Sequence, residues 1–318
     1  MLCVTRPMPS LALNLLRLAR PTQWAKSLFV VLGPLYGLRD HPYSPELAKA
    51  ALVAAAAFAL ASSACYCIND ILDAPKDRHH PRKRNRPVAS GAVSHAAAWA
   101  LALVLAAAAA ALTLMLPTAV RWPLLAVIGL YVLNVTAYSA FMKHVAVLDV
   151  LSLSSGFVLR VVGGCVAAAI APSTWLLNVT FFLSMFLAFG KRLGERRLLG
   201  DNAPNARGVQ TVYTDDTLRM FVVVTAVATL ITYSFYVQSR DAAGRIVLAG
   251  FPEGVNILWL TLLPATYALA RSIILLDKGE FDDPTEIAAK DPPMQLAALV
   301  FGVITVLAFV PHVTHLRG

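Results

Sequence analysis

Stretches of about twenty mostly apolar residues recur along the whole of this 318-residue chain. A helix of roughly 20 residues crosses a hydrocarbon core about 30 Å thick, and the Ala- and Leu-rich content of these stretches favours helices over a barrel. Only 14% of the residues are charged, too few to coat a soluble globule. We therefore predict an all-α polytopic membrane protein, a single domain (residues 1–318) with a bundle of about nine transmembrane helices. The apolar stretches lie near residues 21–38, 47–68, 95–116, 122–140, 145–170, 174–190, 217–238, 254–276 and 295–316.

Basic residues are distributed unevenly between the loops that join these stretches, and the formal net charge is +9. With a cytoplasmic N-terminus, 20 Lys and Arg residues fall on the cytoplasmic side and six on the other. Cytoplasmic loops carry the excess of Lys and Arg, so this distribution predicts a multi-pass protein of the cell inner (plasma) membrane. Within the N-terminal segment, residues 1–20, we expect residues 10–20 to lie along the cytoplasmic interface as an amphipathic helix.

The first polar loop, residues 69–92, combines acids and bases. On a helix, Asp70, Asp73 and Asp77 would share one face, because their spacing is i, i+3 and i+7. Three clustered carboxylates repel one another unless a cation joins them, and an all-oxygen ligand set favours Mg²⁺. A solvated loop that obeys the positive-inside rule would explain the bases but not three acids on one face. The bases that follow, which suit phosphate oxygens, are Arg78, Arg82, Lys83, Arg84 and Arg86.

The order Asn69-Asp70-x-x-Asp73-x-x-x-Asp77-Arg78, followed by Lys83-Arg84-x-Arg86-Pro87, carries a family resemblance. It resembles the first aspartate-rich motif of the UbiA superfamily of intramembrane prenyltransferases. The resemblance implies a UbiA-like bundle in which Asn69 and the three aspartates bind Mg²⁺ and a substrate diphosphate at a cytoplasm-facing central cavity. Pro75 is a departure, because proline removes the helical hydrogen bond to the carbonyl of Ile71. We expect it to disturb the helix and shift Asp77 relative to the other two carboxylates.

The second polar segment, residues 191–219, is expected to be a loop and to distinguish between branches of the superfamily. Aromatic-prenylating members usually carry a second aspartate-rich cluster here, whereas this chain has four bases and one acid in Lys191-Arg192-Leu193-Gly194-Glu195-Arg196-Arg197. With three further motifs, the segment is similar to the decaprenyl-phosphate phosphoribosyltransferase branch. The further motifs are Arg20-Pro21-x-Gln23-Trp24-x-Lys26, Lys143-His144-x-x-x-Leu148-Asp149 and Ser155-Gly156-Phe157-x-Leu159-Arg160.

This resemblance implies an enzyme that transfers 5-phosphoribose from phosphoribosyl diphosphate to a polyprenyl (decaprenyl) phosphate and releases diphosphate, with Mg²⁺ as its cofactor. The expected partners are these two substrates and the lipid bilayer; nucleic acid is not expected, and a homo-oligomer is compatible with the sequence. Asp70, Asp73 and Asp77 would be the catalytic metal ligands, and Glu195 would orient Lys191 or add a metal contact. The other expected substrate-binding residues are Lys26, Asn69, Arg78, Lys83, Arg84, Arg86, Lys143, Arg160, Lys191 and Arg192.

Two other functions stay open at this point. A UbiA-type prenyltransferase would move a polyprenyl group from a prenyl diphosphate to an aromatic acceptor, and the missing second acidic cluster argues against it. A transporter of an anionic lipid or metabolite would use intramembrane charges as its pathway. The sequence has no pair of short, broken apolar stretches in matching halves, which argues against a transporter.

Asp149 and Arg160 lie inside the fifth apolar stretch, where charges are costly. They are eleven residues apart, a rise of roughly 16 Å on a helix, so they cannot pair with each other. Each therefore needs a partner on another helix or a ligand. For Arg160 that ligand would be a substrate phosphate.

Overall fold

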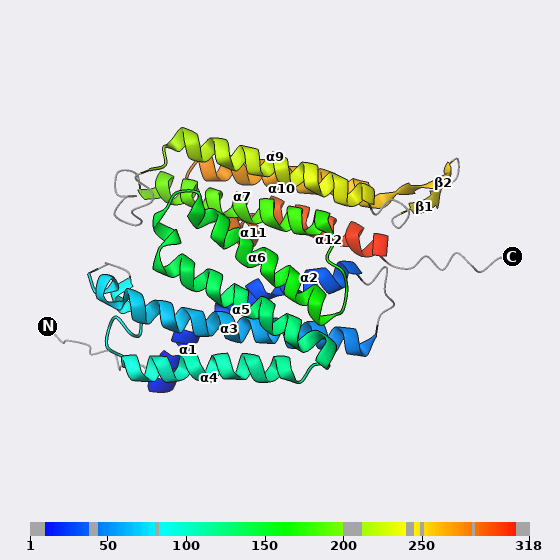
Figure 1. Ribbon diagram of the computed structural model, residues 1–318. Helices are drawn as coiled ribbons and strands as arrows, with labels where there is room; N and C mark the ends of the chain where they lie inside the picture. Colours follow the sequence, from blue (N-terminus) through cyan, green and yellow to red (C-terminus); the bar gives the residue numbers. More distant parts are fainter. Residues whose placement is uncertain are drawn as a thin grey trace. The chain divides into compact units, whose positions relative to one another are not determined.

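The computed structural model describes residues 10–37, 44–79, 83–199, 212–239, 245–248, 251–281 and 284–309, and this part of the chain is mostly helical (Figure 1). The expected all-α membrane fold is therefore confirmed. The α-helices are α1 (Leu11–Ala19), α2 (Leu28–Gly37), α3 (Pro45–Asp77), α4 (His95–Leu114), α5 (Thr118–Ala140), α6 (Leu148–Ala167), α7 (Thr174–Leu199), α9 (Asp215–Ser239), α10 (Leu262–Asp277), α11 (Pro284–Lys290) and α12 (Pro292–Phe309). Short 3-10 helices are η1 (Pro21–Ser27), η2 (Lys83–Asn85), η3 (Met142–His144) and η7 (Ile257–Thr261).

Seven helices within the described residues are long and apolar enough to cross a membrane. A shorter apolar helix, Pro292–Ala308, follows, and α2 adds ten residues. Each apolar stretch of the sequence thus contains helix, while the number of spans, expected to be about nine, stays a prediction.

Helix α3 carries the aspartate-rich motif at its C-terminal end. Its 33 residues extend about 50 Å, so it is longer than the hydrocarbon core is thick. Ser44 caps its start by accepting the amide hydrogen of Leu47 at 3.1 Å. The expectation that Pro75 would disturb the helix is wrong, because the helix continues to Asp77. Pro75 lies in the last turn, so the hydrogen bond that it removes is among the last of the helix.

Helix α7 also extends further than the sequence predicts. The prediction of a loop from residue 191 onward is wrong for residues 191–199, because α7 remains helical to Leu199. The charges that indicated a solvated loop belong to Arg192, Arg196 and Arg197, and each of these arginines meets a carboxylate of the protein. Side chains that are paired in this way are compatible with a helix that stays packed.

A short antiparallel hairpin between α9 and α10 was not predicted from the sequence. It consists of β1 (Arg245–Leu248) and β2 (Phe251–Asn256), with Arg245 opposite Asn256 and Ile246 opposite Val255. The first residues of the apolar stretch near 254–276 therefore belong to a strand. Asn256 then begins η7, because its side chain accepts the amide hydrogen of Leu258 at 3.1 Å.

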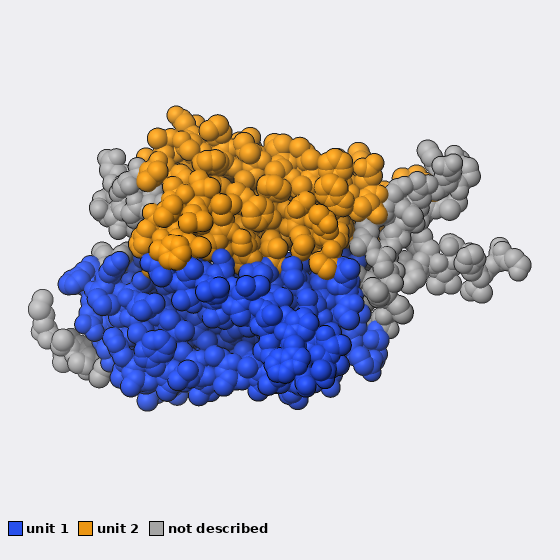
Figure 2. Space-filling view, viewed as in Figure 1, with its two compact units in different colours: residues 1–38, 42–140, 159–171 blue, residues 39–41, 141–158, 172–318 orange. Residues whose placement is uncertain are grey.

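The chain divides into two compact units (Figure 2). Unit 1 comprises residues 1–38, 42–140 and 159–171, and unit 2 comprises residues 39–41, 141–158 and 172–318, so α6 contributes to both. In unit 1, α3 and α4 lie side by side (Figure 1). The core of this unit includes Phe58 of α3 with Leu124 and Tyr131 of α5. In unit 2, α7 and α9 lie side by side, with Phe189 and Leu218 in the core.

Glycines bring α2 and the second half of α6 into close contact within unit 1. A Cβ atom added to Gly164 would lie 1.7 Å from the carbonyl oxygen of Val30, and one added to Gly33 would lie 2.3 Å from Sγ of Cys165. Helices in membranes associate through small residues that let their backbones approach closely. These two glycines therefore permit the packing of α2 against α6.

We expect Gly164→Ala to lower the stability of the protein by about 1–3 kcal/mol or more, because the added methyl group meets backbone that cannot move aside. Gly129→Ala, in α5, is the matched control, because a Cβ atom there meets nothing within 4 Å. Thermal unfolding of both variants in detergent measures the difference. Equal melting temperatures for the two variants would contradict the close contact.

Candidate active site

Two aspartates at the end of α3 converge on one arginine. Nη1 of Arg86 lies 2.7 Å from Oδ2 of Asp77 and 3.3 Å from Oδ1 of Asp70. Asp70 and Asp77 are only 2% and 3% exposed. The two carboxylates therefore do share one face of α3, as the i, i+7 spacing predicts.

A tight turn after η2 holds Arg86 over this face. The amide of Ser90 donates to the carbonyl of Arg86 at 2.9 Å, and the amide of Val93 donates to the carbonyl of Pro87 at 2.9 Å. Gly91 adopts φ +78°, a left-handed conformation that glycine accepts at no steric cost. Val88 and Val93 are buried in a cluster that also contains Ile71 and Ala74 of α3, so apolar packing fixes the turn to the helix.

Arg20 provides a second cation for Asp70. Its Nη2 lies 2.5 Å from Oδ1 of Asp70, and its guanidinium lies over the ring of Tyr66, 4.9 Å from the centroid. Nearby, Trp24 donates to Oγ of Ser63 at 2.9 Å, and Ser63 donates to the carbonyl of Ala19 at 2.7 Å. Arg20 belongs to one of the motifs that carry the family resemblance but was not predicted to lie at the site. Its neighbours in sequence gave no signal that it would reach α3.

This arrangement fits a divalent cation, although the expected three-aspartate cluster is not formed. Within the described residues, no group of three or more His, Cys, Asp or Glu side chains is placed to hold a metal ion. Asp70 and Asp77 nevertheless already direct their oxygens at one positive group, the Arg86 guanidinium. Mg²⁺ is commonly held by one or two carboxylates, with waters and substrate phosphates completing its shell. Asp73 and Asn69 lie half-buried on the same helix.

The remaining bases predicted around this motif differ in exposure. Lys26 lies exposed on η1, and Arg78 and Arg84 are exposed beyond the end of α3. Lys83 is half-buried in η2. Arg82 lies outside the described residues. The exposed side chains are accessible to a phosphorylated ligand.

Arg160 lies in the core of unit 1. It is 4% exposed and donates to the hydroxyl of Tyr131 at 2.6 Å and to Oγ of Ser62 at 3.2 Å. Its guanidinium also lies 4.6 Å from the centroid of the Tyr131 ring. The sequence left two kinds of partner open for Arg160, a group on another helix or a ligand. The structure shows partners on two other helices, α3 and α5.

Asp149 and Arg192 form a buried ion pair in unit 2. Nε and Nη2 of Arg192 each lie 2.6 Å from Oδ2 of Asp149, and the two residues are 1% and 0% exposed. Tyr213 donates its hydroxyl to Oδ1 of Asp149 at 3.2 Å. Burial raises the pKa of Tyr213 to about 12, so the hydroxyl keeps its proton near neutral pH. Arg192, predicted to bind a substrate phosphate, is thus occupied by a carboxylate of the protein.

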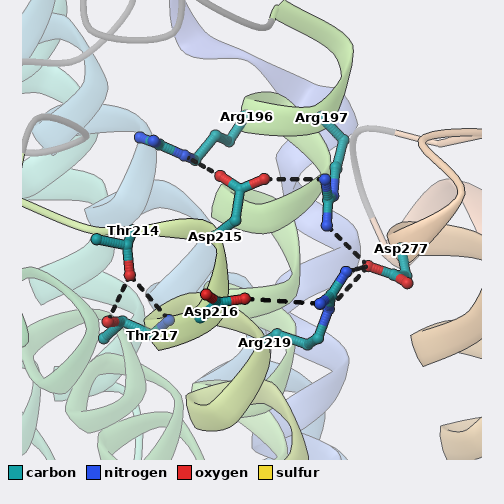
Figure 3. A network of polar contacts seen from close by, with 8 residues as sticks. All are labelled: Arg196, Arg197, Thr214, Asp215, Asp216, Thr217, Arg219 and Asp277. Atoms are coloured by element: carbon teal, nitrogen blue, oxygen red, sulfur yellow. Dashed lines mark hydrogen bonds and ion pairs between the residues drawn. The ribbon is translucent and has the colours of Figure 1, made fainter.

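A second network joins the ends of α7, α9 and α10 within unit 2 (Figure 3). Asp215 bridges Arg196 and Arg197, with 2.9 Å from its Oδ2 to Nη1 of Arg197. Asp277 in turn accepts from Nη2 of Arg197 at 3.2 Å and from Nη2 of Arg219 at 2.7 Å. Three of the four bases in the segment 191–197 therefore have carboxylate partners.

Three predicted residues of unit 2 are half-buried at helix ends or turns. Lys143 lies in η3, before α6, and Lys191 and Glu195 lie one turn apart on α7. All three take part in polar or electrostatic contacts within the protein. Tyr213, which was not predicted as a site residue, links Val147, just before α6, and Asp149 of α6 to the start of α9.

Comparison with known sequences gives matches over most of the chain. The model of the UbiA prenyltransferase family matches residues 28–299. The decaprenyl-phosphate phosphoribosyltransferase of Mycolicibacterium smegmatis is 35% identical over 304 residues, which cover 93% of this chain and 92% of that protein. The enzyme of the same name from Corynebacterium glutamicum is 32% identical, over 95% of this chain and 89% of that protein.

Solved structures confirm the fold. A UbiA homologue from Archaeoglobus fulgidus, solved with DMAPP and Mg²⁺ bound, superposes with a TM-score of 0.67 over 93% of this chain and 99% of its own. The two sequences are only 15% identical. The match therefore identifies a shared arrangement of helices.

We expect Asp149→Asn and Arg192→Gln each to destabilise the protein by about 3–5 kcal/mol, because either leaves a buried charge without its partner. The double variant should lose less stability than the sum of the losses in the two single variants. Denaturant unfolding of the single and double variants gives the coupling energy.

Lys290→Gln is the control for this measurement. It removes a pair with Glu286 whose side chains are 63% and 46% exposed, and such pairs are worth about 1 kcal/mol or less. Additive losses for Asp149 and Arg192 would exclude the buried pair as a stabilising unit.

Proposed function

This chain belongs to the UbiA prenyltransferase family, and from that membership we propose that it is a membrane-bound decaprenyl-phosphate phosphoribosyltransferase. It transfers 5-phosphoribose from phosphoribosyl diphosphate to decaprenyl phosphate or a similar polyprenyl phosphate, and releases diphosphate. The observation that carries the proposal is the similarity to relatives of that name over at least 89% of both chains. The whole chain acts as one UbiA-like transmembrane domain.

The acidic end of α3 is the proposed binding site for the diphosphate. When bound, Mg²⁺ held by Asp70, Asp73 and Asp77 would neutralise charge on the departing diphosphate. Arg86 contacts two of these carboxylates, and we assign its guanidinium to an oxygen of the same diphosphate. Binding of substrate phosphates is further assigned to Lys26, Asn69, Arg78, Lys83, Arg84, Lys143, Arg160 and Lys191, with Glu195 orienting Lys191, whereas Arg192, predicted from the sequence, is left to its buried partner Asp149.

The reaction replaces one phosphate ester of the ribose with another. The bond between the anomeric carbon and the diphosphate oxygen breaks, the carbon becomes oxocarbenium-like, and an oxygen of the lipid phosphate forms the new bond. That lipid phosphate is already an anion at neutral pH, so the protein needs no dedicated general base. Placement of the two substrates and stabilisation of the negative charge that develops account for catalysis.

The membrane setting follows from the charge distribution. Seven described helices can cross a bilayer, and we infer from the 20 to six distribution of bases that the N-terminus and the active site face the cytoplasm. The lipid substrate would be supplied from the inner (plasma) membrane itself.

Prenyl transfer to an aromatic acceptor is the second candidate, because the family and the fold include prenyltransferases. In unit 2, however, the carboxylates of Asp215 and Asp277 are bound by arginines. This pairing favours the phosphoribosyl branch over a second acidic metal motif.

Purified full-length protein should form lipid-linked phosphoribose from labelled phosphoribosyl diphosphate, decaprenyl phosphate and Mg²⁺. It should form no product from a prenyl diphosphate and 4-hydroxybenzoate. The reverse outcome would establish the prenyltransferase alternative.

Asp73→Asn should abolish turnover and leave the melting temperature unchanged, because it removes a half-buried carboxylate assigned to the metal. Asp216→Asn is the matched control, since that carboxylate is 94% exposed on α9, and it should retain activity. Full activity of Asp73→Asn in the presence of Mg²⁺ would refute the assignment.

Lys191→Ala should raise the KM for phosphoribosyl diphosphate about ten- to a hundredfold, because a hydrogen bond to a charged group is worth about 1.5–3 kcal/mol. Lys278→Ala, at the exposed end of α10, is the control for loss of a cytoplasmic lysine. A donor titration with an unchanged KM would show that Lys191 only contributes to topology.

A further inference from the structure

The turn that enters α6 contains an unusual backbone conformation. Val147 has φ +67°, which is a genuine outlier for a β-branched side chain. Its carbonyl oxygen accepts the amide hydrogen of Leu151 at 2.9 Å, so the outlier lies where the helix begins. Lys143 lies in η3, four residues earlier in the same connection between α5 and α6. Such outliers persist only where surrounding groups hold them.

The hydroxyl of Tyr213 holds this turn. It accepts the amide hydrogen of Val147 at 2.6 Å and donates to Oδ1 of Asp149 at 3.2 Å. Tyr213 is 3% exposed, and its ring packs edge-on against Phe189 of α7, 6.2 Å between centroids. One hydroxyl thus connects the outlier to the buried carboxylate that binds Arg192.

The residues that follow Tyr213 fix its backbone. Thr214 accepts the amide hydrogen of Thr217 at 3.1 Å and so caps the first turn of α9. Asp215 is held by Arg196 and Arg197, as Figure 3 shows. The tyrosine therefore projects from a rigid helix start that is tied to the end of α7.

We propose that Tyr213 is a positioning residue for the donor-binding lysines of unit 2. Through Val147 its hydroxyl holds the end of the short connection in which η3 carries Lys143, and through Asp149 it fixes Arg192, the neighbour of Lys191 on α7. The proposal deepens the proposed function and rests on it, since the role of both lysines toward phosphoribosyl diphosphate is part of that function.

The test compares Tyr213→Phe with Tyr213→Phe/Val147→Gly in the full-length protein. Tyr213→Phe removes one hydrogen-bond partner from Val147 and from Asp149, and should raise the donor KM about three- to tenfold with a smaller change in kcat. Glycine adopts the left-handed region freely, so Val147→Gly should return most of that KM change. Tyr233→Phe is the matched control. It removes another buried hydroxyl, 2.5 Å from Thr261 in the same unit, and should leave the donor KM unchanged.

Hydrogen exchange over residues 141–151 gives a readout that does not depend on activity. Exchange should be faster in Tyr213→Phe than in wild type or Tyr233→Phe. An unchanged donor KM in Tyr213→Phe, no recovery in the double variant, or unchanged exchange over this segment would each overturn the proposal. Failure of wild-type protein to transfer phosphoribose would instead overturn the proposed function, and exchange would still show whether Tyr213 holds the turn.

Discussion

The pairing of buried charges determines which segments of this protein lie together. A charged group that leaves water needs an opposite charge or hydrogen-bonding groups within the protein. Arg192 meets Asp149 across 43 residues of sequence, and Arg20 meets Asp70 across 50. Apolar packing alone is permissive in a bundle rich in Ala and Leu. These ion pairs specify which turn of one helix faces which turn of another.

The ion pairs differ in burial, and this difference distinguishes a pair that stabilises the fold from one that can take part in substrate binding. Arg192 is almost fully buried with its carboxylate, so exchanging that partner for a ligand would carry a large desolvation penalty. The side chain of Arg86 is 26% exposed. Its guanidinium is therefore partly hydrated, and water can compensate part of a contact that a ligand displaces. A partly exposed guanidinium of this kind can transfer from a carboxylate to a phosphate when another cation takes its place beside the buried Asp70 and Asp77. The acidic end of α3 is therefore the better candidate for exchange with substrate.

Much of the fold could be predicted from the sequence, because apolar stretches and the i, i+3, i+7 spacing are local patterns. The helical aspartate motif and the shared face of Asp70 and Asp77 follow from that spacing. The extension of α7 could not be predicted, since the acids that pair with its bases come from α6, α9 and α10. Arg20 and Tyr213 were missed as contacts of the aspartates for the same reason. Which distant side chain meets a charge depends on tertiary structure and not on neighbouring residues.

The basic segment of α7 shows what this means for substrate recognition. By sequence its four bases offer a strongly positive surface for phosphates. In the structure Asp149, Asp215 and Asp277 neutralise Arg192, Arg196 and Arg197. The field of this segment on a ligand is therefore much weaker than four unopposed charges would produce. For the proposed function this means that recognition of the phosphorylated donor depends less on the total charge of the segment than on the position of individual side chains in it.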